Sequence, residues 1–248
     1  ERDNNKILAD LVRLRAERAK LLGYDTHADL VLETRMAKTP DNVLNLLTDL
    51  LGRALPVAKR EREEMQQIID AEGGNFRLAA HDWWYYAEKL RKAKYDLDET
   101  ELRPYFTLDN ARDGAFAVAN KLYGITFTRI SDIPLPHPDA QAFEVKEADG
   151  SHVGVLYMDF FPRESKRQGA WCGGYREHRV IDGKEITPVV TIVGNFTPPA
   201  EGKPALLSMD DVLTLFHEFG HGLQALFSEN RYGSTTVAWD IVELPSQI

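Results

Sequence analysis

The first half of the chain repeats its hydrophobic residues at the spacing of amphipathic helices. Apolar side chains recur every three or four residues from Ile7 to Leu22, which predicts a helix with an apolar stripe along one side. Thr39 and Pro40 combine a capping hydroxyl with a proline in the first turn, as is typical of a helix start. We expect that helix to kink at Pro56, because proline has no N–H to donate. Helices are therefore expected over 7–22, 26–35, 40–72, 79–95 and 108–123.

After residue 124 the pattern changes to short runs that are typical of β-strands. Strands are expected over 125–130, 142–147, 152–158 and 189–193. Asp149-Gly150 and Asp182-Gly183 have the composition of two-residue hairpin turns, and Gly173-Gly174 predicts another turn. We expect a mainly α fold with a small β-sheet (α+β), organised as a helical region over 1–124 and a region over 125–248 that holds the sheet. The two regions are expected to be parts of one domain.

A strongly apolar helix is expected to begin at Ser208. Ser208 and Asp211 have the spacing of a capping box, with Asp in place of the usual Glu. Hydrophobic residues then cover much of the helix circumference, so we expect the helix to be buried. A short final helix is expected from Val237 to the end of the chain.

The buried helix contains the sequence His217-Glu218-Phe219-Gly220-His221. Residues four apart lie on one helix face, so His217 and His221 can both reach one zinc ion. Glu218 points about 100° away around the helix, where its carboxylate can take a proton from a metal-bound water. The spacing therefore predicts two zinc ligands and a catalytic base.

A catalytic zinc site normally has three protein ligands, and Glu243 is the candidate for the third. It follows Asp240-Ile241-Val242, an apolar setting in which an unpaired carboxylate would be costly. Asp240 is either an acceptor that orients a ligand histidine or an ordinary helix cap. We expect one Zn²⁺ per chain, held by His217, His221 and Glu243.

Composition and net charge limit the binding partners and the cellular locations that we expect. The formal net charge of −9 repels phosphate backbones, so we expect no nucleic-acid partner. No stretch approaches the eighteen or so apolar residues of a membrane span. The single cysteine, Cys172, has no partner for an internal disulfide and no base nearby in the sequence, so a cysteine nucleophile is not expected. We expect a cytoplasmic location, with the periplasm left open because the chain does not begin with Met.

The sequence resembles the thimet oligopeptidase family of zinc peptidases, and within it the bacterial peptidyl-dipeptidases and oligopeptidase A. The matching segments are 83–96, 154–171, 194–198, 210–223 and 240–247. The resemblance implies a mostly helical fold with a narrow channel that admits short peptides. It places the zinc ligands on His217, His221 and Glu243, and the general base on Glu218. The strand around 189–195 either flanks the cleft and offers backbone groups to a peptide or is purely structural.

Two departures from the family leave alternatives open. Members of the family are longer at both ends, so we expect this chain to be an internal fragment of a catalytic domain. In the family, a loop rich in Gly and Tyr after the third ligand stabilises the oxyanion, and no residue here matches it. The main prediction is a zinc-dependent metallo-oligopeptidase or peptidyl-dipeptidase. The alternatives are an inactive metal-binding or structural module, and a structural metal site with a fourth ligand.

Overall fold

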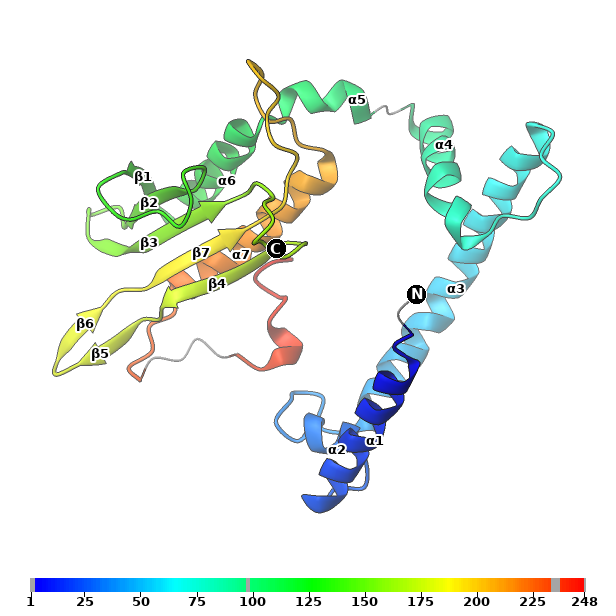
Figure 1. The fold of residues 1–248 in the computed structure, drawn as a ribbon, viewed down its shortest axis with the longest axis horizontal. Helices are drawn as coiled ribbons and strands as arrows, with labels where there is room; N and C mark the ends of the chain where they lie inside the picture. The colour runs from blue at the N-terminus through cyan, green and yellow to red at the C-terminus, as the bar shows by residue number, and fades with distance from the viewer. Residues whose placement is uncertain (1–2, 97–98, 233–236, 248) are drawn as a thin grey trace. The chain divides into compact units, whose positions relative to one another are not determined.

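The computed structural model describes residues 3–96, 99–232 and 237–247. They divide into two compact units, which are the described parts of 1–98 with 238–240 and the described parts of 99–237 with 241–248. Helices predominate, and a five-stranded mixed sheet and a two-stranded sheet accompany them (Figure 1), which confirms the expected α+β class. The change from helix to strand near residue 124 does not coincide with the boundary between the units, because α6 (Leu108–Tyr123) packs in the second unit.

The first unit consists of helices at the positions that the hydrophobic pattern predicts. They are α1 (Asn5–Leu21), α2 (His27–Leu32), α3 (Pro40–Ala71), the 3₁₀ turn η1 (Ala80–Asp82) and α4 (Trp83–Tyr95). The Thr39 hydroxyl caps α3 by accepting a hydrogen bond from the Asn42 N–H, and α3 continues through Pro56. Met65 and Ile69 of α3 pack with Tyr86 of α4 to form a small buried core.

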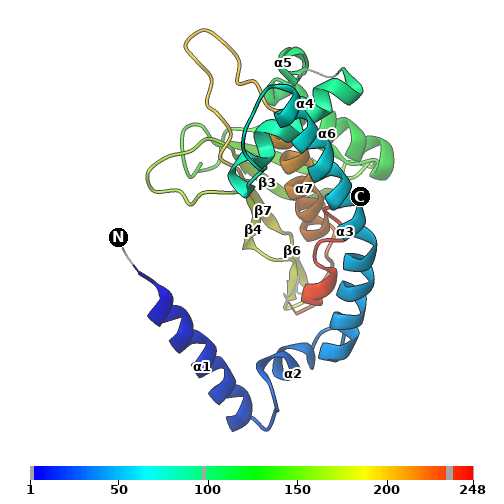
Figure 2. The same ribbon diagram turned by 90° about the vertical axis from the view of Figure 1, so that its right-hand side faces the viewer.

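The second unit is built on a five-stranded sheet with the strand order β1-β2-β3-β7-β4. The strands are β1 (Thr126–Ile130), β2 (Gln141–Lys146), β3 (His152–Asp159), β4 (Trp171–Arg176) and β7 (Val189–Val193). β3 and β7 are parallel, and the other pairs are antiparallel. Helix α7 (Met209–Leu226) lies against β3, β7 and β4, as Figure 1 and Figure 2 show. Leu156 and Ile192 of the sheet pack in one core with Leu215 and Phe219 of the helix, so the apolar sequence of α7 is explained by burial.

Two expectations from the sequence were wrong. Gly173 and Gly174 do not form a turn but lie inside β4, where they pair with Thr191 and Val190 of β7. The register shifts just after Gly174, so the glycines mark an irregularity in a strand at the end of the sheet. The predicted helix from Val237 is instead one 3₁₀ turn, η3 (Trp239–Ile241), followed by hydrogen-bonded turns. A proline at 245 disfavours helical geometry in the residue before it and removes a donor.

Four short elements remain in the described residues: the two strands of a hairpin, one helix and one 3₁₀ turn. The hairpin of β5 (Arg179–Ile181) and β6 (Lys184–Ile186) forms as expected from the turn residues Asp182-Gly183. The short helix α5 (Glu99–Leu102) and the 3₁₀ turn η2 (Arg103–Tyr105) were not expected. No helix in the described ranges has both the length and the hydrophobicity to cross a membrane.

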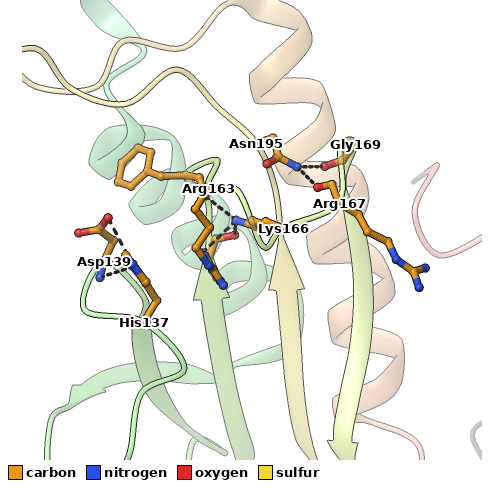
Figure 3. A network of polar contacts seen from close by, with 9 residues as sticks. His137, Asp139, Arg163, Lys166, Arg167, Gly169 and Asn195 are labelled. Atoms are coloured by element: carbon orange, nitrogen blue, oxygen red, sulfur yellow. Dashed lines mark hydrogen bonds and ion pairs between the residues drawn. The ribbon is translucent and has the colours of Figure 1, made fainter.

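A buried ion cluster links the loop after β3 to the C-terminal end of that strand (Figure 3). Arg163 donates two hydrogen bonds to the Asp159 carboxylate, at 2.9 and 2.7 Å. The Lys166 ammonium lies 2.9 Å from the same carboxylate and also donates to the carbonyl oxygens of Asp159 and Phe161. Burial raises the pKa of Asp159, but the two cations outweigh that effect and hold the pKa below its ordinary value. The cluster therefore stabilises this loop more strongly when Asp159 is charged.

The capping box at the start of α7 is present as the sequence predicts. The Ser208 hydroxyl accepts a hydrogen bond from the Asp211 N–H at 3.1 Å, and the Asp211 carboxylate accepts one from the Ser208 N–H at 2.9 Å. Replacing Ser208 with Ala is expected to lower the free energy of unfolding by about 1 kcal/mol, measured by urea denaturation. Ser208→Thr keeps the acceptor and should lose less; equal losses in both variants would contradict a capping role for this hydroxyl.

Candidate metal centre

Helix α7 presents two histidines one turn apart. The His217 and His221 ring centroids are 4.9 Å apart and the rings are nearly perpendicular, at 89°. The His217 side chain is 35% exposed and that of His221 is 17% exposed. Both imidazoles are therefore held by the helix and remain within reach of a ligand from solvent.

Glu243 approaches both histidines from the turns that follow η3. Its Oε2 atom lies 3.2 Å from His217 Nε2 and 3.1 Å from His221 Nε2. One ligand atom from each of the three residues lies within 4.8 Å of the others. The three residues span 26 positions in the sequence, from 217 to 243, and the fold brings their side chains together.

The three side chains fit a zinc ion by their chemistry and by their spacing. Two neutral imidazoles and one carboxylate are a ligand set known for catalytic zinc. Ligand atoms at ordinary zinc distances and tetrahedral angles lie about 3.3–3.5 Å apart, which is close to the two separations between histidine and Glu243.

Glu218 is buried beside the two histidines, with 7% of its surface exposed. Burial is the largest influence on its carboxyl and raises the pKa, while the neighbouring His217 and His221 act in the opposite direction. A main-chain hydrogen bond from Cys172 of β4 also stabilises the charged form. The carboxylate therefore lies between the helix and the last strand of the sheet, in a position suited to exchanging a proton.

The thiol of Cys172 is not suited to nucleophilic chemistry. Burial, together with the nearby Glu218 carboxylate, raises its pKa to about 12. A thiol with that pKa stays protonated at neutral pH and is a poor nucleophile. This raised pKa disfavours a cysteine nucleophile, and the expectation that Cys172 is not catalytic stays a prediction.

Asp240 has main-chain partners in the first unit. It lies in η3, and its carboxylate accepts a hydrogen bond from the Ala37 N–H at 2.9 Å. Hydrogen bonds from main-chain amides, first that of Met36, lower its pKa. Its role in orienting a ligand histidine stays a prediction, and the observed contact explains the residue without that role.

Ser246 contacts Glu243, the third candidate ligand. This contact was not predicted from the sequence. The Ser246 hydroxyl lies 2.9 Å from Glu243 Oε2, and this contact is the largest cause of the lowered pKa of Glu243. The only hint in the sequence is that Ser246 falls in the last segment of the family resemblance, three residues after Glu243.

The strand at 189–193, a candidate for peptide binding, is an interior strand of the sheet. Residues 189–193 form β7, which is hydrogen-bonded to β3 on one side and to β4 on the other. The main-chain groups of 189–193 are therefore already paired within the sheet and are not available to a peptide, while a role for 194–195 beside the cleft stays a prediction. The sheet ends at β4, on the side where Cys172 contacts Glu218.

Comparison with known proteins identifies the family to which this chain belongs. The profile of peptidase family M3 matches residues 1–248, the whole of the chain. The chain belongs to this family, which is the one that the resemblance indicated.

Individual relatives agree with the family match. The chain is 43% identical over 250 residues to a dipeptidyl carboxypeptidase of Salmonella typhimurium and 40% identical over 252 residues to oligopeptidase A of Escherichia coli. It is 31% identical over 264 residues to saccharolysin of Saccharomyces cerevisiae. Each alignment covers 99% of this chain but only 36% or 37% of the relative. The chain thus spans little more than a third of the length of the relatives it matches.

Proposed function

We propose that this chain forms the metal-binding part of a peptidase that hydrolyses short peptides with one zinc ion. The observation that supports it most strongly is the approach of Glu243 to both His217 and His221, with Glu218 buried beside them. Family membership and relatives named as an oligopeptidase and a dipeptidyl carboxypeptidase supply the substrate class. Internal cleavage and release of dipeptides from the C-terminus are both compatible with these names.

The proposed division of labour follows from the side chains. His217, His221 and Glu243 would hold the metal, which when bound supplies a more acidic water and polarises the scissile carbonyl. Glu218 takes the proton of the attacking water and then passes it to the leaving amine. Because burial raises the pKa of Glu218, its protonated form is a realistic donor in the second step.

The cellular location and the binding partners are proposed from the composition of the chain. The net charge of −9 disfavours nucleic acids. A cytoplasmic location fits a single cysteine without a disulfide, and the periplasm stays an alternative. Short peptides are therefore the proposed partners.

Removal of zinc is the first test of this function. The purified chain is expected to contain close to one equivalent of zinc and to lose it to a chelator such as 1,10-phenanthroline. Peptide cleavage should be assayed on the 248-residue chain and on a completed chain, meaning these residues joined to the flanking segments of the Salmonella relative. Cleavage should stop with the chelator and return with added zinc.

The outcomes separate the proposed enzyme from its alternatives. Absence of zinc from both versions would contradict the metal site. Zinc without cleavage, even in the completed chain, would favour a metal-binding or structural module, and a fourth protein ligand on the zinc would favour a structural site.

A further inference from the structure

The glycine inside the histidine motif lies against the turns that carry Glu243. A methyl group placed on Gly220 would overlap the carbonyl oxygen of Pro245 and lie 2.8 Å from the Cα of Ser246. Both neighbours are main-chain atoms, so no side-chain rotation can relieve the overlap. Only a residue without Cβ allows the segment to approach α7 this closely.

Other helical glycines of the same unit are not constrained in this way. In α7, a methyl group on Gly222 would meet the end of the Ile192 side chain at 3.0 Å, a tight contact but one with side-chain rather than main-chain atoms. In α6, a methyl group on Gly114 would meet nothing within 4 Å. The contact at Gly220 is therefore specific to the place where the 241–247 segment crosses the helix.

The segment that rests on Gly220 also holds the Glu243 carboxylate. Ser246, whose Cα lies at the contact, places its hydroxyl 2.9 Å from Glu243 Oε2 and 2.8 Å from the Glu243 carbonyl oxygen. The Leu244 N–H donates to the Ile241 carbonyl at 3.0 Å and closes the turn around Glu243. The Oε2 atom that Ser246 contacts is the same one that approaches both histidines.

We infer that Gly220 and Ser246 are positioning residues for the third ligand, an inference that rests on the proposed zinc site. Gly220 sets the distance between the 241–247 segment and α7, and Ser246 sets the orientation of the Glu243 carboxylate. Gly220 then contributes to the site because it has no side chain. Its contact with the 241–247 segment cannot be inferred from the spacing of the histidine motif.

The test of Gly220 compares Gly220→Ala with the matched control Gly114→Ala. Alanine is favoured over glycine inside helices, so both apoproteins would gain helix stability if local preference alone mattered. Zinc affinity is measured by competition with a chromophoric chelator, and unfolding of the apoprotein is measured by circular dichroism. We expect Gly220→Ala to weaken zinc binding by about tenfold or more, and Gly114→Ala to leave it unchanged.

The test of Ser246 compares Ser246→Ala with Ser246→Thr, which keeps a hydroxyl. Loss of a hydrogen bond to a ligand typically weakens metal binding by about 10- to 100-fold. We expect that loss for Ser246→Ala and rescue by Ser246→Thr. The visible absorption of the cobalt-substituted protein should change in Ser246→Ala, because it reports the arrangement of the ligands, whereas a purely structural role would leave it unchanged.

These measurements distinguish the inference from the function on which it rests. A wild-type chain that binds no zinc overturns both. A wild-type chain that binds zinc, with Gly220→Ala and Ser246→Ala binding it equally tightly, overturns the inference alone. If Gly220→Ala does not fold, the two Ser246 variants decide.

Discussion

Replacing Glu218 with Gln is expected to reduce peptide hydrolysis by about 100- to 10,000-fold, the range attributed to a positioned general base. Gln has nearly the same size but cannot take up a proton. Zinc content should stay the same, because the proposed ligands are His217, His221 and Glu243. The rates should be measured with a short peptide in the completed chain, alongside zinc analysis of the same preparation.

The control for this variant is Glu201→Gln, which removes a carboxylate from an exposed loop. It should retain the activity of the unsubstituted protein. Hydrolysis by Glu218→Gln at an undiminished rate would exclude Glu218 as the base. Loss of zinc together with loss of activity would instead indicate that this carboxylate helps to hold the metal.

Replacing Asp159 with Asn is expected to lower the free energy of unfolding by about 3–5 kcal/mol, the cost of leaving a buried charge without its partner. The Lys166 side chain is only 2% exposed and that of Asp159 only 6%. Asn has nearly the size of Asp but leaves the ammonium without a counter-charge. Urea denaturation at neutral pH measures the difference.

The matched control is Asp139→Asn, since Asp139 pairs with His137 at the surface and is 57% exposed. A surface pair of this kind contributes about 0–1 kcal/mol. A loss at Asp159 no larger than that at Asp139 would show that the buried cluster does not stabilise the fold.

The dependence on pH provides an independent check of the same cluster. The pKa of Asp159 is lowered in the folded protein, so its charge stabilises the fold above the ordinary carboxyl pKa of about 3.9. That contribution is lost as the pH falls through the lowered pKa. The difference between the unsubstituted protein and Asp159→Asn should therefore be full near neutral pH and shrink in acid.

Most helices and strands were predictable because their signals are local. The Thr39 and Ser208 caps and the Asp182-Gly183 turn each act over four residues or fewer. β4 was not predictable because its glycine pair is typical of a turn, and only pairing with β7 makes it a strand. The final 3₁₀ turn was misread as a helix because the apolar residues before Pro245 also fit a helical pattern.

The candidate site was predictable to the extent that it lies on one helix. The four-residue spacing of His217 and His221 determines that both face the same way, whatever the rest of the fold. The approach of Glu243 required the apolar context of that residue and the family resemblance. The contacts of Gly220 and Ser246 were beyond prediction, since they depend on where a segment some 25 residues later crosses the helix.

The parallel pairing of β3 with β7 has a consequence for the order in which the protein folds. β1, β2 and β3 follow one another through short connections, so they can pair early. β3 ends at Asp159 and β7 begins at Val189, so that pair forms only after a long loop has closed, at an entropic cost. α7 packs mainly on β7 and β4, and we therefore expect the helix that carries the histidines to dock late on the folding pathway.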